Sequence, residues 1–211
     1  MSKLQLPDGL ETRVAHIELR EDDGPPRIVG HAALFNSMSL DIGGFMGGFR
    51  ETIEPGAFDD AIDGSDIRSL FNHDSNIVLG RMSAGTLTVA EDDVGLLSET
   101  TPPDTQLVRD MVLTPMRRKD ITQMSFAFSV KPGKAGAVFD EDDDGNVVRT
   151  IVAGGVRELY DTSVVTYPAY PDTTVAVRSL HDILETDEER KRLIVAHAAY
   201  RARCIRLMVL D

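Results

Sequence analysis

Short apolar runs, some alternating with polar residues and some continuous, cover the chain up to about residue 180. Gly, Pro and acidic residues stand between these runs. The pattern is typical of β-strands joined by tight turns. The predicted strands are 12–20, 27–34, 51–54, 66–71, 77–81, 85–90, 95–101, 121–131, 137–139, 147–152, 157–166 and 174–177.

Two short helices are predicted between these strands. The first, 57–62, follows Pro55-Gly56. The second begins after Pro102-Pro103-Asp104 and runs from 105 to about 113, with Asp104 as its N-cap. Pro115 lacks a backbone N–H, so we expect it to kink or end this helix.

The strands and helices together predict a mostly β fold with helices, of the α+β class. We expect a compact β-barrel of short, largely antiparallel strands, with the helices packed outside it. Residues 1–11 are predicted to form an N-terminal arm and 12–180 the body of the protein. Residues 181–211 contain no Gly or Pro and carry helix-forming residues at helical spacing, which predicts a separate C-terminal helical extension.

Charge and cysteine content exclude several classes of protein. The net charge of −13 argues against binding to nucleic acid or to an anionic membrane. The single cysteine, Cys204, cannot form an intramolecular disulfide and fits a reducing compartment. No apolar run reaches the roughly 18 residues of a membrane span, and the N-terminus lacks a signal-peptide pattern. We therefore expect a soluble cytosolic protein.

Three polar residues with catalytic chemistry lie inside apolar, strand-like runs: His73, Ser125 and Asp161. Each one alone is more often structural than catalytic. A serine hydrolase, however, needs a nucleophile, a base that takes its proton, and an acid that orients the base. Because the three residues lie far apart in sequence, they can only meet across neighbouring strands.

Two other residues compete with Asp161 for the third role. Glu158 is a second acid on the same predicted strand, and His31 could orient a histidine from another strand. The cations of Arg117-Arg118-Lys119 are expected to sit at a helix C-terminus, where they are favoured, and the alternative is that they line a substrate or oxyanion site. The Gly-rich residues 36–48 are expected to form a mobile loop that meets a partner.

Metal and cofactor motifs are weak. Asp140, Asp142, Asp144 and Gly145 match the opening of a calcium loop, but Ile151 stands where that loop needs a bidentate glutamate. No Cys/His group has zinc spacing, and no phosphate-binding glycine loop is present. We therefore predict no metal and no cofactor, and expect the acidic run to form the tip of a hairpin with Asp144-Gly145 in its turn.

Several of these segments together resemble the prohead maturation proteases of tailed bacteriophages, serine peptidases that are related in fold to the herpesvirus assemblins. The matching segments occur in the order of that family and lie within residues 12–178. They are GHAALFN at 30–36, FRETIEPGAF at 49–58, LFNHD at 70–74, LGR at 79–81, MSFAF at 124–128 and DTSVVTYPAYPD at 161–172.

The resemblance implies an assemblin-like fold with residues 12–180 as the protease domain, and a catalytic triad of His73 as base, Ser125 as nucleophile and Asp161 as acid. Aspartate stands where such proteins often have glutamate, so its reach to His73 is shorter. The implied substrates are the scaffold protein, the scaffold-like part of the major capsid protein and the protease itself. The implied location is the host cytoplasm, inside the immature capsid.

The resemblance also suggests that residues 181–211 form a removable extension that targets the protease into the shell. The alternative is a helix that simply packs on the barrel. The resemblance leaves room for a homo-oligomer. The competing function is a catalytically inactive scaffold or capsid-associated structural protein with the same fold.

Overall fold

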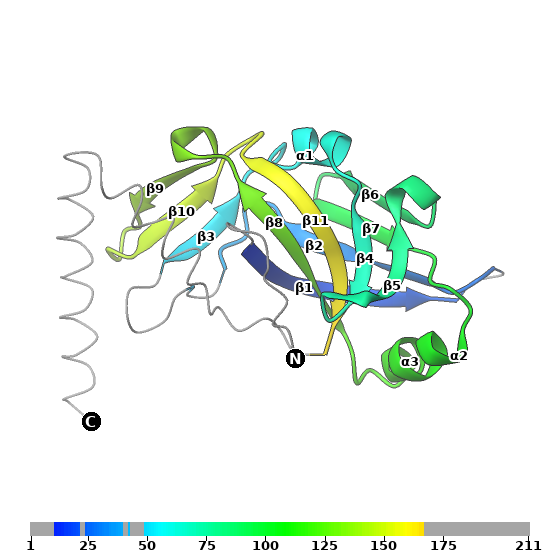
Figure 1. Ribbon diagram of the computed structural model, residues 1–211. Coiled ribbons are helices and arrows are strands. Elements are labelled where there is room, and N and C mark those ends of the chain that lie inside the picture. The colour runs from blue at the N-terminus through cyan, green and yellow to red at the C-terminus, as the bar shows by residue number, and fades with distance from the viewer. Residues whose placement is uncertain (1–10, 22–23, 40–41, 43–48, 167–211) are drawn as a thin grey trace, which may run out of the picture.

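The computed structural model describes residues 11–21, 24–39, 42 and 49–166, and its main feature is one curled eight-stranded sheet (Figure 1). This confirms the predicted mostly β, barrel-like fold. In spatial order the strands are β5 (Asp74–Arg81), β4 (Arg68–Phe71), β11 (Val156–Val165), β8 (Gln123–Val130), β1 (Glu11–Arg20), β2 (Arg27–Leu34), β7 (Gly95–Thr100) and β6 (Leu87–Glu91). Neighbours are antiparallel except β4 and β11.

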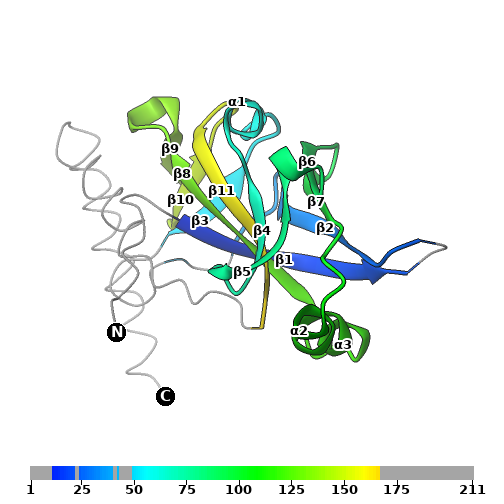
Figure 2. The ribbon, with the colours of Figure 1, turned by 45° about the vertical axis from the view of Figure 1, so that its right-hand side comes forward.

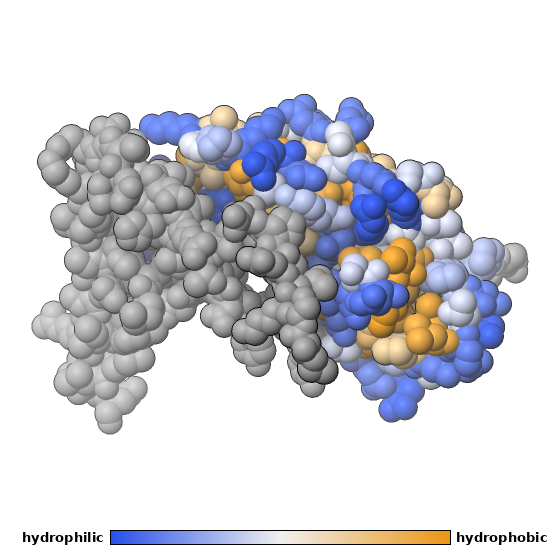
Figure 3. All heavy atoms as spheres, viewed as in Figure 1, coloured by the Kyte–Doolittle hydropathy of each residue, from blue (hydrophilic) through white to orange (hydrophobic). Residues whose placement is uncertain are grey.

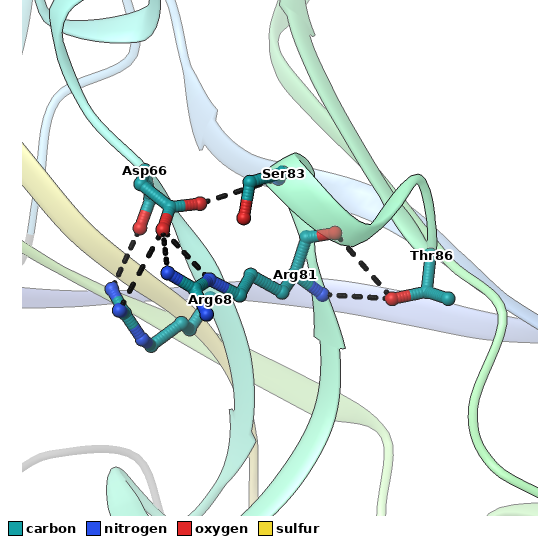
Figure 4. Close-up of polar contacts among 5 residues, drawn as sticks. All are labelled: Asp66, Arg68, Arg81, Ser83 and Thr86. Atoms are coloured by element: carbon teal, nitrogen blue, oxygen red, sulfur yellow. Dashed lines mark hydrogen bonds and ion pairs between the residues drawn. The ribbon is translucent and has the colours of Figure 1, made fainter.

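The two edge strands of this sheet, β5 and β6, come together and almost close the barrel. They follow each other in sequence through the short helix η2 (Met82–Ala84), and Thr86 exchanges backbone and side-chain hydrogen bonds with Arg81 (Figure 4). A Cβ atom on Gly80 would lie 2.8 Å from the Thr86 carbonyl oxygen. Glycine at this position therefore allows the edges to approach each other.

Asp66 fastens the same corner through its carboxylate. It accepts hydrogen bonds from the guanidinium of Arg81 and from the backbone N–H of Ser83, and it pairs with Arg68 at 3.7 Å (Figure 4). The bond from Arg81 is the main cause that lowers the pKa of Asp66 to about 2. The polar groups of this exposed corner therefore have partners.

A second, three-stranded sheet is formed by β3 (Arg50–Ile53), β10 (Val147–Ile151) and β9 (Ala137–Glu141), in that order. Arg149 of β10 and Glu51 of β3 form a buried ion pair at 3.1 Å. The guanidinium of Arg149 also lies 5.8 Å from the ring centre of Phe49. The two residues are register partners in the parallel pairing of β3 and β10, and removing either one would leave a buried charge.

The barrel interior is filled by apolar side chains from the inner face of the sheet, including Phe126 and Phe128 of β8. The helix α1 (Asp59–Gly64) and the helical segment 106–117 lie at opposite ends of the sheet (Figure 2). Phe58, just before α1, packs edge-on against Phe126 with ring centres 5.6 Å apart. The carboxylate of Glu91 accepts the backbone N–H groups of Gly56 and Phe58, which ties this end to β6.

The second predicted helix differs from its expected form. Thr105, rather than Asp104, caps it by accepting the N–H of Val108. The helix does not end before Pro115, because α2 (Gln106–Val108) continues through a π-helical turn, η3 (Arg109–Leu113), into α3 (Thr114–Arg117). The wider turn just before the proline accommodates its missing N–H.

Most other predicted elements agree with the structure to within one or two residues at their ends, whereas β5 begins at Asp74, three residues before the predicted strand 77–81. The Asp144-Gly145 hairpin turn between β9 and β10 is present, and the Asp142 carboxylate accepts the N–H groups of Asp144 and Asn146 there. A short helix not predicted from the sequence, η4 (Gly133–Ala135), precedes β9. The predicted strand 174–177, the extension 181–211, residues 1–10 and most of loop 36–48 lie outside the described residues.

Candidate active site

The candidate site lies on the outer face of β8 and β11. Side chains alternate along a strand, so Thr162 and Val164 face the barrel interior and Asp161 and Ser163 face outward. In the register of the two strands, Ser163 lies opposite Ser125, and Asp161 lies opposite Ala127. These four residues form the corners of a small square on the sheet.

A β-bulge just before this square determines which acid faces the site. The register of β11 shifts between Leu159 and Asp161, so Tyr160 is the extra residue. The bulge places both Glu158, opposite Ser129, and Asp161 on the outer face, although their spacing would put them on opposite faces of a regular strand. Asp161 is the acid beside Ser125, whereas Glu158 is farther along the strand and exposed.

His73 lies in a two-residue turn between β4 and β5. Phe71 pairs with Asp74, and the two residues between them, Asn72 and His73, both have positive φ angles of 52° and 55°. Such angles are those of a type I′ hairpin turn, whose twist matches that of the flanking strands. The strand predicted over 77–81 therefore begins earlier than expected: Asp74 begins β5, and the histidine itself occupies the turn.

The turn is tied to the end of β11. The backbone N–H of Asn72 donates to the carbonyl of Val164 at 2.8 Å, and its side-chain oxygen accepts the N–H of Thr166 at 2.9 Å. These contacts compensate for the unfavourable positive φ angles of two residues that are not glycine. They hold the histidine over the same strand that carries Asp161.

The structure brings His73 and Asp161 together. Nδ1 of His73 lies 2.7 Å from Oδ1 of Asp161. A carboxylate only accepts hydrogen bonds, so Nδ1 carries the proton and donates it, which leaves Nε2 of a neutral ring as an acceptor. This is the tautomer that a general base requires.

Ser125 is fully buried and lies diagonally across the square from Asp161. Its Oγ and Nε2 of His73 are both buried and have no hydrogen-bond partner among the described residues. No direct bond joins them in this structure. The diagonal of two cross-strand pairs is roughly 7–8 Å between Cα atoms, a spacing that an imidazole ring with one hydrogen bond at each end can bridge. Ala127 and Ser163, at the other two corners, have small side chains.

Ser163 was not predicted as a site residue, although it belongs to the quoted segment 161–172. Its hydroxyl donates to Oδ1 of Asp161 at 2.5 Å, the same oxygen that His73 contacts. The sequence contains one signal for it: residues two apart on a strand share a face, so Ser163 follows Asp161 on the site side.

The other residues that were considered for the site bond to partners elsewhere in the structure. His31 of β2 bonds to Asp92 at 2.8 Å, and this bond is the main cause that lowers the pKa of Asp92 to about 2. Arg117 pairs with Glu21 on the surface. Within the described residues, neither the imidazole of His31 nor the guanidinium of Arg117 contacts the candidate site.

An apolar surface flanks the site. Figure 3 shows it as orange spheres in the region of β5 and the helical segment from α2 to α3. Val78 of β5, Leu107 of α2 and Met111 of η3 are among the exposed apolar side chains of the described chain. Apolar surface next to a candidate site suits the binding of apolar side chains of a partner.

In the part of the chain that the structure describes, no group of three or more His, Cys, Asp or Glu side chains is arranged to hold a metal ion. None of its helices has the length and apolar character needed to cross a membrane.

Comparison with known proteins adds one match. A model of the caudovirus prohead serine protease family matches residues 14–188, which is most of the chain. No curated protein and no solved structure matches it. The relationship to the assemblins therefore stays a prediction.

Proposed function

The chain belongs to the caudovirus prohead serine protease family, and from this premise we propose that it matures capsids with Ser125 as nucleophile, His73 as base and Asp161 as the acid that orients the base. Its proposed substrates are the scaffold protein or the scaffold-like part of the major capsid protein, and the protease itself. Its proposed place of action is the inside of the immature capsid.

The observation that carries this proposal is that one ring nitrogen of His73 has a hydrogen-bond partner and the other does not. Nδ1 of His73 is bonded to Asp161 at 2.7 Å, while Nε2 and the Oγ atom of Ser125 are buried without partners on the same face. Buried polar atoms normally have hydrogen-bond partners, and exceptions concentrate where chemistry takes place. A hydroxyl and a base nitrogen that both lack partners are suited to each other and to a bound substrate.

The proposed reaction has two steps. Oγ of Ser125 attacks the peptide carbonyl carbon while Nε2 of His73 takes its proton, and the histidine then gives this proton to the leaving amine. An acyl-enzyme remains, and water, deprotonated by Nε2, hydrolyses it and restores the serine. Asp161 stays ionised and stabilises the positively charged imidazolium that forms in each step.

The donors that stabilise the tetrahedral oxyanion are proposed to come from outside β8. This strand is hydrogen-bonded to a neighbour on each side, β1 and β11, so its backbone N–H groups are used in hydrogen bonds within the sheet. The nucleophile thus differs from one in a sharp turn, where backbone N–H groups can face the substrate. Because Ser125 is fully buried, a peptide reaches it only after the site opens.

The proposal is tested by producing the full chain together with the major capsid protein of the same phage and following both on gels and by mass spectrometry. We expect shortened capsid protein with the natural sequence and none with Ser125→Ala. Ser129→Ala is the matched control, because Ser129 is also buried on the outer face of β8 but bonds to Tyr160. Unchanged processing by Ser125→Ala would refute the assignment, and no processing by the natural chain in assembled proheads would favour the inactive structural protein.

A further inference from the structure

Ser163 is placed where it controls the orientation of the Asp161 carboxylate. It is fully buried, lies two residues after Asp161 on β11 and is directly opposite Ser125 on β8. Its hydroxyl donates to Oδ1 of Asp161 at 2.5 Å, and Nδ1 of His73 contacts the same oxygen at 2.7 Å. One carboxylate oxygen thus receives two donors.

Two donors on one oxygen restrict the rotation of the carboxylate about its terminal torsion, which is otherwise broad. Asp161 is shorter than the glutamate that the resemblance led us to expect, so it has less freedom to find the imidazole by itself. A fixed carboxylate fixes the direction of the Nδ1–H bond and with it the direction in which Nε2 points. Hydrogen bonds to an ionised group are also stronger than those between neutral groups.

Two other buried hydroxyls of these strands have different partners. Thr162 of β11 bonds to Ser98 inside the barrel at 2.9 Å, and Ser129 of β8 accepts from Tyr160 at 3.4 Å. Neither contacts Asp161 or His73 in the described structure. The bond from Ser163 is therefore a feature of the site rather than of buried hydroxyls in this sheet.

We propose that Ser163 is a positioning residue that holds the Asp161 carboxylate and, through it, turns His73 toward Ser125. The inference rests on the proposed function, because positioning has meaning only where His73 and Ser125 react. Ser163 makes no contact with the substrate in this account.

The kinetic test compares Ser163→Ala, Ser163→Thr and the control Ser129→Ala on a capsid-derived peptide. We expect Ser163→Ala to lower kcat at least about tenfold, the effect of losing one hydrogen bond to a charged group, with KM changed less than about twofold. Ser163→Thr keeps the hydroxyl and should remain within about threefold of the natural chain. Equal activity of Ser163→Ala and the natural chain would overturn the proposal.

A second measurement does not need activity and guards against a variant that folds poorly. In a Ser125→Ala background, proton NMR follows the downfield resonance of the hydrogen-bonded Nδ1–H of His73, assigned by its loss in His73→Ala. Ser163→Ala should shift or broaden this resonance, whereas Ser129→Ala should not. An unmoved resonance would overturn the positioning role, while a moved resonance together with full processing by Ser125→Ala would instead refute the proposed function.

Discussion

Both faces of β11 carry polar residues, but the hydrogen bonding of polar groups differs between the two faces. On the inner face, Thr162 is fully buried and its hydroxyl bonds to Ser98 at 2.9 Å. On the outer face, Asp161 is hydrogen-bonded to both Ser163 and His73, yet Oγ of the neighbouring Ser125 and Nε2 of His73 have no partner among the described residues. The hydroxyl described on the inner face thus has a hydrogen-bond partner, whereas two polar atoms on the outer face have none.

This difference separates polar groups that stabilise the fold from those available for chemistry. Leaving a buried polar group without a partner costs about 1–3 kcal/mol, whereas a satisfied pair costs little or contributes. A barrel could avoid the cost on its outer face with alanine or valine at position 125. The presence of two such atoms at one site, Oγ of Ser125 and Nε2 of His73, is what a site awaiting a substrate would require.

The largest expected effect comes from changing the acid of the outer face. Asp161→Asn should reduce kcat by roughly 10⁴-fold, because an amide can hold His73 in the wrong tautomer. Glu158→Gln, on the same face of the same strand but exposed, should stay within about twofold. Cleavage of a capsid-derived peptide measures both, and the opposite ranking of the two variants would move the third catalytic role to Glu158.

A smaller effect, on stability, should appear with opposite signs on the two faces. Thr162→Val leaves the Ser98 hydroxyl without its partner and should lower the free energy of unfolding by about 1–3 kcal/mol. Ser125→Ala removes a hydroxyl that already has no partner, so the free energy of unfolding should stay the same or rise by about 1 kcal/mol. Urea denaturation measures both, and a large loss for Ser125→Ala would show that its hydroxyl has an unseen structural partner.

The smallest expected effect concerns a third polar cluster, the exposed Asp66 corner. The folded pKa of Asp66, about 2, lies below the unfolded value near 4, so its contribution to stability is present above about pH 4 and is lost as the pH falls toward 2. Urea denaturation of the natural chain and of Asp66→Asn should therefore differ at pH 6, and the difference should shrink over that window. The effect should weaken in high salt because the cluster is exposed. A difference that does not change with pH would assign the stabilisation to another contact.

Much of the fold follows from the sequence because strand alternation and turn residues are local signals. Strand boundaries agree closely, and the Asp144-Gly145 turn is present. The turn at Asn72-His73 could not be predicted in this way, since it lacks the glycine that usually marks a type I′ turn. Its positive φ angles are stabilised by contacts with β11, which lie far away in sequence.

The candidate site was predictable in its members but not in its arrangement. His73, Ser125 and Asp161 stand out because each is polar within an apolar run, and Glu158 and His31 were equally open on that basis. Only the register shows that the Tyr160 bulge brings Asp161 beside Ser125, and only three-dimensional contacts place His31 against Asp92. The spacing of two residues puts Ser163 on the face of Asp161, but the sequence does not show that its hydroxyl bonds to the Asp161 carboxylate.

The position of β8 between β1 and β11 also bears on when the enzyme can first act during its own synthesis. β1 is the first described strand to leave the ribosome, and β11 is the last. The strand with Ser125 can take its place early against β1, but Asp161 and the segment that anchors the His73 turn arrive only with β11. Pairings between such distant segments form late in folding. On the proposed assignment, a nascent chain therefore carries its nucleophile and base before it carries the acid and the segment that position the base.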